Sequence, residues 1–148
     1  GWNTYMQHFN VDGTFTCGWS IAGDRITSSQ SFTLNEWQHV AIVIDNASLT
    51  LYRNGISMGS ITSSNYSGLG GFGDLVFSAS GGGNPAWQNA KYDEIRIWDH
   101  ARTLTEIKGG GRSFKMYEFY GDILPSGLLA YYKGDTFMGQ DDCYYMGR

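Results

Sequence analysis

Short apolar runs separated by glycine, asparagine and aspartate recur along the chain. The clearest is Val40-Ala41-Ile42-Val43-Ile44-Asp45, whose nearly continuous apolar character predicts a strand buried on both faces. Asn46-Ala47-Ser48 interrupts this run, and residues 49–52 resume it. Asn54-Gly55 then supplies the positive φ angles of a two-residue hairpin turn. The pattern therefore predicts a meander of antiparallel strands.

The same reasoning predicts elements on both sides of this meander. Residues 4–11 and 14–21 are expected to pair as a hairpin around Asp12-Gly13. Residues 26–32 are rich in serine and threonine and predict an edge strand or a loop, whereas residues 56–66 are polar enough to predict a long connection. Further strands are predicted at residues 74–79, 116–120 and 128–132, with glycine-rich loops at 68–73 and 81–85.

One short helix is expected near residue 105. Thr103 is followed three residues later by Glu106, which is the spacing of a capping box, and Gly109 stands where a helix would end.

Several of these segments also follow one another in a familiar order. Trp37 comes two residues before a His-Val-Ala strand, Leu51-Tyr52-Arg53-Asn54-Gly55 follows, and residues 92–98 read Tyr-Asp-Glu-Ile-Arg-Ile-Trp. Residues 101–107 then read Ala-Arg-Thr-Leu-Thr-Glu-Ile, with Arg102 in place of the usual leucine. Over about residues 5–107 the chain resembles the laminin-G-like branch of the concanavalin A-like lectin/glucanase superfamily. The resemblance implies an all-β fold, an antiparallel jelly-roll β-sandwich.

The chain departs from this family at its start. The first three or so strands of the family have no counterpart before residue 4. Residues 127–132 resemble the opening strand of such a domain, so segment 113–148 is predicted to add C-terminal strands to a single domain over residues 1–148. Alternatively, a second copy covers the exposed edge, because open strand edges readily pair. We favour a homodimer.

Composition narrows the class of protein. The chain has 148 residues, 21 of them glycine, with 16% aromatic and 16% charged residues, which suits short strands and turns. Its net charge is −4, so no basic surface is expected to bind nucleic acid. The apolar runs are shorter than the roughly 20 residues of a membrane helix, and no membrane insertion is expected. The spacing of Cys17 and Cys143 does not match that of a metal site. Two thiols and a disulfide between them are the alternatives for this pair.

Because the superfamily includes glucanases, a hydrolytic activity has to be considered, and it would depend on the arrangement of the carboxylates. Glycoside hydrolysis needs two carboxylates about 5–9.5 Å apart on one sugar. Related glucanases alternate acids on one strand face, but here Glu94 is followed by Arg96 on that face, while Asp93 points the other way. Glu94 and Arg96 are predicted to form an ion pair, and the chain is predicted not to be an enzyme. No nucleophile elbow accompanies the histidines, for which structural roles are expected: His8, His39 and His100.

The aromatic residues favour a binding role instead. Tryptophan and tyrosine combine a flat apolar face with a polar edge, which suits sugar rings, and the chain has 5 and 10 of them. Two lie in polar or glycine-rich segments and are expected to be more exposed than Trp37 and Trp98. The predicted ligand-binding residues are these two and their neighbouring amides: Trp87, Tyr66, Asn84 and Gln88.

Calcium is the metal that the resemblance implies, at a loop rim. Asp74 and Asp24 sit at predicted loop edges and offer hard oxygen ligands, as does Asn84. The alternative is that these residues only form turns at strand ends.

The sequence thus predicts a non-catalytic, lectin-like binding module, with an oligosaccharide or glycoprotein as the favoured partner. The alternative is a protein-interaction or assembly module without sugar affinity. Aromatic residues in a loop flanked by amides favour sugar, whereas a flat apolar face or strand edge favours a protein. The resemblance alone implies an extracellular or cell-surface location.

Overall fold

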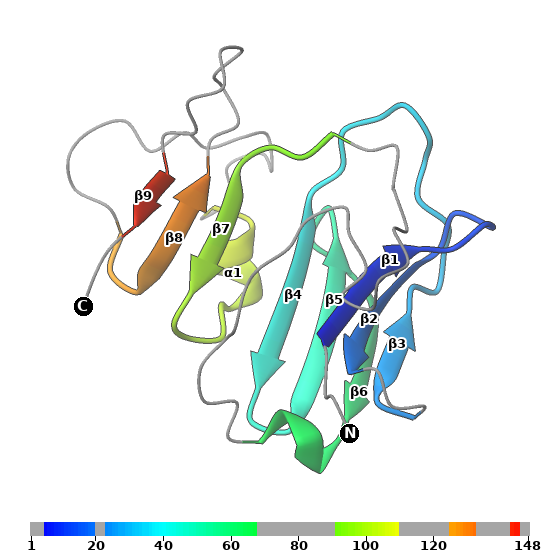
Figure 1. Cartoon of the computed structure of the whole chain (residues 1–148), viewed down its shortest axis with the longest axis horizontal. Coiled ribbons are helices and arrows are strands. Elements are labelled where there is room, and N and C mark those ends of the chain that lie inside the picture. Colours follow the sequence, from blue (N-terminus) through cyan, green and yellow to red (C-terminus); the bar gives the residue numbers. More distant parts are fainter. Residues whose placement is uncertain (1–4, 20–22, 68–90, 110–124, 133–142, 146–148) are drawn as a thin grey trace. The chain divides into compact units, whose positions relative to one another are not determined.

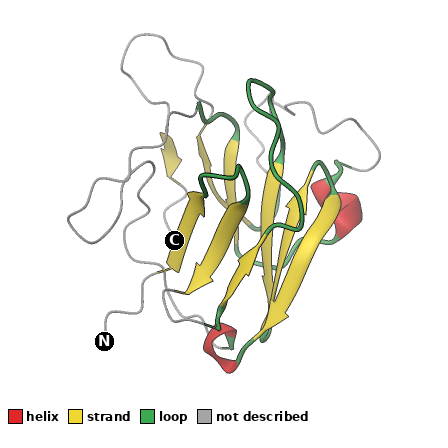
Figure 2. Ribbon diagram, turned by 90° about the vertical axis from the view of Figure 1, so that its right-hand side faces the viewer, coloured by secondary structure: helices red, strands yellow, loops and turns green. Residues whose placement is uncertain are grey.

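The computed structural model describes residues 5–19, 23–67, 91–109, 125–132 and 143–145. The chain divides into two compact units, residues 1–89 and 90–148 (Figure 1). Every strand pairing in the described part is antiparallel, and the helical segments there are two short ones, drawn red in Figure 2. The predicted all-β, antiparallel class is confirmed. The prediction of one domain over residues 1–148 stays a prediction.

The first sheet of unit 1 has the strand order β1-β2-β3. Its strands are β1 (Tyr5–Phe9), β2 (Phe15–Trp19) and β3 (Arg25–Thr27). The turn between β1 and β2 is held by Asp12, whose Oδ1 accepts hydrogen bonds from the backbone N of Thr14 at 2.9 Å and from its hydroxyl at 2.6 Å. Gly13 has a φ of 79°, which glycine adopts without strain. The predicted Asp12-Gly13 hairpin is confirmed.

The second sheet of unit 1 is the predicted meander. It comprises β4 (Val40–Asp45), β5 (Ser48–Arg53) and β6 (Ile56–Thr62) in that order. Asn54 and Gly55 turn the chain with φ angles of 48° and 68°, as predicted. The expectation that residues 40–45 are buried on both faces is wrong, because no residue of β4 is fully buried: its two end residues are exposed and the four between them are half-buried, with Ile42 and Ile44 packed against the core.

The prediction of a long connection at residues 56–66 is also wrong. These residues form β6 and a single 3-10 turn, η1 (Ser64–Tyr66). The polar side chains of β6 find partners on β5: Ser60 shares a hydrogen bond with Thr50 at 3.0 Å, and Thr62 with Ser48 at 3.2 Å. A strand that places hydroxyls on one face and Met58 in the core therefore looks polar in sequence.

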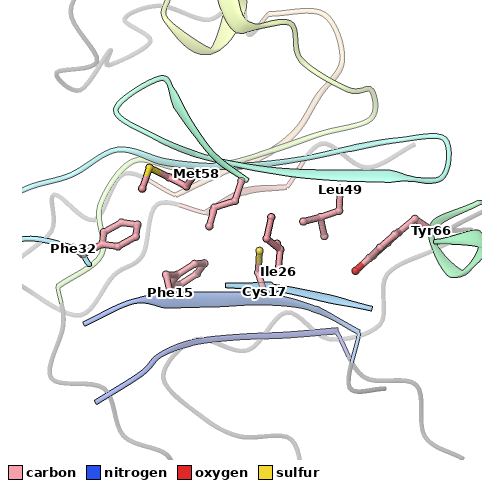
Figure 3. Close-up of a cluster of buried hydrophobic side chains, with 8 residues drawn as sticks. Phe15, Cys17, Ile26, Phe32, Leu49, Met58 and Tyr66 are labelled. Carbon is pink, nitrogen blue, oxygen red and sulfur yellow. The ribbon is translucent and has the colours of Figure 1, made fainter. Parts of the chain in front are cut away.

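The core of unit 1 lies between its two sheets, as Figure 3 shows. Phe9 and Phe15 meet edge to face with ring centroids 5.0 Å apart, and Phe32 lies 5.2 Å from Phe9. The sheets approach closely at β6, where a Cβ on Gly59 would lie 2.6 Å from the Cδ1 of Ile26. Unit 1 is thus a two-layer sandwich around the cluster Phe15, Cys17, Ile26, Phe32, Leu49, Leu51, Met58 and Tyr66.

Unit 2 contains a sheet of order β7-β8-β9 and one helical turn. Its elements are β7 (Ile95–Trp98), α1 (Leu104–Ile107), β8 (Leu128–Tyr132) and β9 (Cys143–Tyr145). The capping box is confirmed, because the Thr103 side chain accepts from the backbone N of Glu106 and the Glu106 side chain accepts from the backbone N of Thr103. Gly109 follows with a φ of 64°.

The strand predicted at residues 128–132 is present as β8. β8 pairs with β7, and β9 pairs with β8. The strands predicted at residues 74–79 and 116–120 lie outside the described residues. Within the described part, no helix is long and apolar enough to cross a membrane.

Candidate functional site

The predicted ligand-binding residues separate into two groups. Trp87, Asn84 and Gln88 lie outside the described residues. Tyr66 is described, and the expectation that it is exposed is wrong, because 1% of its surface is accessible. Its hydroxyl donates a hydrogen bond of 2.5 Å to the backbone carbonyl of Asp24. The burial is tolerated because the polar edge of the ring has a hydrogen-bond partner. Because the residue is buried, its ring face is not available to a sugar.

Gly18 makes room for the buried tyrosine. Its φ of 133° lies in a region that L side chains rarely adopt. A Cβ at this position would overlap the carbonyl oxygen of Asp24 and would lie 2.7 Å from the Tyr66 hydroxyl. The hydrogen bond between Tyr66 and Asp24 therefore depends on a glycine in the neighbouring strand β2.

Asp24, one of the two predicted calcium ligands, lies just before β3 and is linked to the start of η1 by hydrogen bonds. Its carboxylate accepts hydrogen bonds from the side chains of Ser63 and Asn65, which lower the pKa of Asp24. The structure finds no group of three or more metal-ligating side chains within the part of the chain that it describes. The second predicted ligand, Asp74, lies outside that part.

Unit 2 contains a partly buried polar cluster of Glu94, Arg96 and Tyr131. Glu94 and Arg96 form the predicted ion pair, with 8% and 17% of their side chains exposed. The Tyr131 hydroxyl donates to both carboxylate oxygens of Glu94, at 2.8 and 2.7 Å. The Arg96 guanidinium lies 5.1 Å from the centroid of the Tyr131 ring. The carboxylate of Glu94 is thus engaged by two neighbouring side chains.

The strand that carries this cluster is shorter than predicted. It begins at Ile95 rather than near residue 92, because Glu94 has a φ of 54° and cannot continue an extended strand. The sequence pattern identified Glu94 and Arg96 as partners but gave no signal for Tyr131, which comes from β8.

The pKa of Tyr131 is also displaced from its ordinary value. Burial raises its pKa to about 12, and its hydrogen bond to Glu94 acts in the same direction. At neutral pH the hydroxyl is therefore a donor to the carboxylate in the folded protein.

Stability is expected to fall as the pH rises from about 10 to about 12. In this window an unfolded Tyr131 loses its proton while a folded one keeps it, so deprotonation favours the unfolded state. Denaturant unfolding at pH 9 and 11.5 would measure the loss in the wild type and in Tyr131→Phe. The variant should lose less stability over this interval. Equal losses in the two proteins would contradict a role for Tyr131.

Trp98 and Trp37 are both more exposed than Tyr66, which reverses the predicted order. Trp98 is half-buried, and the Arg102 guanidinium lies 3.8 Å from its ring centroid. Trp37 was expected to be less exposed than Tyr66, and this is wrong, because 63% of its surface is accessible. It lies in the segment before β4, which begins only at Val40, and so it is not part of a sheet.

The segment around Trp37 is fastened on both sides. Gln38 donates a side-chain hydrogen bond of 2.7 Å to the carbonyl of Thr33. The backbone N of His39 donates to the Asn54 side chain, and the backbone N of Asn54 donates back to the His39 carbonyl, both at 2.8 Å. An exposed indole thus stands on a turn that hydrogen bonds hold in place on both sides.

Comparison with known proteins identifies the family. A family model described as the Concanavalin A-like lectin/glucanases superfamily matches residues 1–108. A search of curated proteins finds no match. Among solved structures, an S-layer domain-containing protein from Clostridium thermocellum is similar, with 22% identity over 72% of this chain and a TM-score of 0.38. This chain covers 62% of that one.

The chain therefore belongs to the Concanavalin A-like lectin/glucanases superfamily, and the predicted fold of that type is confirmed. Laminin-G-like and concanavalin A-like domains are generally non-catalytic binding modules. Family membership thus indicates a binding module.

Proposed function

We propose that this member of the Concanavalin A-like lectin/glucanases superfamily is a carbohydrate-binding module that does not hydrolyse its ligand. The observation that carries the proposal is the engagement of Glu94. A glycosidase needs one carboxylate to donate a proton and another to act as base or nucleophile. Glu94 instead accepts the hydroxyl hydrogen of Tyr131, which its two oxygens share, and pairs with Arg96. This arrangement supports a structural role for the acid.

Carbohydrate is favoured as the ligand by the family and by the composition of one loop. Asn84, Trp87 and Gln88 combine an indole with two amides in a glycine-rich segment. An indole face stacks on the C–H groups of a sugar ring, and amides exchange hydrogen bonds with its hydroxyls. The predicted affinity is millimolar to micromolar, or about 4–8 kcal/mol.

A glycan screen on the whole chain tests this proposal. The wild type is expected to bind at least one neutral oligosaccharide, and Trp87→Ala is expected to lose most of the binding to any glycan held by that loop. Trp87→Phe is the matched control, because it keeps a flat apolar ring. Thermal unfolding of each variant checks that the fold survives. Release of new reducing ends from the bound glycan would contradict the non-catalytic part of the proposal.

A second candidate function is a protein-interaction or assembly module. The observation that favours it is a group of large apolar side chains that are exposed in unit 1, including Val11, Leu34 and Ile56. Light scattering over micromolar concentrations would detect the homodimer that this candidate implies. A screen in which no glycan binds would leave this second candidate as the function.

A further inference from the structure

The exposed large apolar side chains of unit 1 gather at one end of its sandwich. Leu34 and Ile56 have 81% and 67% of their surface accessible, and Trp37 has 63%. Val11 and Val40 are the other exposed large apolar residues described in this unit. They come from the β1–β2 turn, from the segment joining β3 to β4, and from the strand ends beside the β5–β6 turn. We call this the β5–β6 end.

Hydrogen bonds hold these loops to one another. The Ser31 hydroxyl donates to the carbonyl of Asp12 at 2.8 Å, and the backbone N of Phe32 donates to the carbonyl of Gly13, also at 2.8 Å. Register places Val40 and Ile56 on either side of one residue of β5, Arg53. The β5–β6 end is therefore a preformed surface, and its ordering costs little when a ligand binds.

Arg53, at the centre of this end, is engaged by its neighbours. Arg53 donates to Gln30 Oε1 at 2.9 Å and to the Ser31 carbonyl at 2.5 Å, and its guanidinium lies 5.3 Å from the centroid of the Phe32 ring. Glu36, by contrast, is exposed in the turn beside Trp37. The charge that this turn presents is therefore negative, which disfavours anionic ligands.

Three neighbouring side chains in this turn have unused hydrogen-bonding capacity. Asn35, Glu36 and Trp37 make no side-chain hydrogen bond within the described part of the chain, whereas Gln38 and Asn54 are already engaged. Asn35 has a φ of 60°, which forms the turn. One turn thus offers an amide, a carboxylate and an indole N–H around an exposed aromatic face.

We propose that the turn of Asn35, Glu36 and Trp37 binds a neutral glycan, an inference that rests on the proposed carbohydrate-binding function. A pyranose ring stacks on the Trp37 indole, and its hydroxyls exchange hydrogen bonds with Asn35 and Glu36. Leu34 lies in the same turn and is exposed, and its aliphatic surface suits a sugar carrying an apolar substituent such as an N-acetyl methyl group. Aliphatic residues alone would suit a protein equally well, but unused polar groups beside one indole suit a sugar better.

The test uses the whole chain and chitohexaose, a neutral N-acetylglucosamine hexamer, with hyaluronan oligosaccharides as the anionic comparison. Calorimetric titration is expected to detect chitohexaose binding, and Trp37→Ala should weaken it about tenfold or more. Trp37→Phe should retain most of the affinity, because the ring remains. Glu36→Gln should weaken chitohexaose binding and reduce the discrimination against hyaluronan. Leu129→Ala, an exposed apolar residue of unit 2, is the matched control and should bind like the wild type.

Each other outcome overturns the inference in a distinguishable way. If glycans bind the wild type and Trp37→Ala alike while Trp87→Ala loses binding, the proposed function stands and the Trp37 site is wrong. If no glycan binds in a broad screen, the proposed function fails as well. If Trp37→Ala instead abolishes self-association seen by light scattering and chitohexaose does not bind, the β5–β6 end is an interface between two copies. Because Trp37 is exposed, its substitution should leave the unfolding temperature nearly unchanged.

Discussion

Replacing Gly18 with alanine is expected to lower the free energy of unfolding by about 3–5 kcal/mol. Two costs add at this position. The φ of 133° is strained for any residue with a Cβ. The new methyl group would also overlap the carbonyl of Asp24 and press on the Tyr66 hydroxyl and on the Cα of Arg25 at 2.9 Å. Two of these neighbours are backbone atoms, one in β3 and one in the residue just before it, so they can move only if the chain at this edge of the sheet shifts.

Gly23→Ala is the matched control for this prediction. Gly23 also has a positive φ, 102°, but a Cβ there would meet no atom within 4 Å. The control therefore reports the cost of strain without the overlap, and it should destabilise the protein clearly less than Gly18→Ala. Denaturant unfolding of the three proteins measures both differences. Equal losses in the two variants would show that the space around Tyr66 is not limiting.

The turns and the helix cap were predictable because their chemistry is local. Asp12-Gly13 and Asn54-Gly55 need only adjacent residues to form a hairpin turn, and Thr103 needs only Glu106 three residues on. The ion pair of Glu94 and Arg96 was predictable because the two residues are close in sequence, although Glu94 lies just before β7 and not in it. Such features are specified by residues close in sequence.

Exposure was predicted poorly because it depends on partners far along the chain. Tyr66 can be buried because its hydroxyl donates a hydrogen bond to the carbonyl of Asp24, which is 42 residues away in the chain. β6 looked polar because its hydroxyls pair with Ser48 and Thr50 on β5. Trp37 is exposed because it lies outside the sheet, in the segment before β4, which begins only at Val40. Polarity along one segment therefore did not reveal which aromatic residue faces solvent, and the candidate site at Trp37 was missed.

Removing the positive charge from the polar cluster of unit 2 is the second change expected to have a large effect. Arg96→Met is expected to lower the free energy of unfolding by about 2–4 kcal/mol, because it leaves a mostly buried carboxylate without its cation. Methionine keeps much of the arginine side chain's length, so the loss reports charge and hydrogen bonding more than packing. The contact of the guanidinium with the Tyr131 ring is lost as well.

Arg102→Met is the matched control, since Arg102 also lies over an aromatic ring, that of Trp98, and pairs with a glutamate, Glu106, at 3.6 Å. That pair is more exposed, so its loss should destabilise the protein much less. Adding Glu94→Gln to Arg96→Met should recover part of the stability, because no buried charge then remains and the amide oxygen can still accept from Tyr131. Denaturant unfolding of the single and double variants measures this coupling. A double variant less stable than Arg96→Met alone would mean that Glu94 stabilises unit 2 without Arg96, and the cluster would then depend on Tyr131 as its main partner.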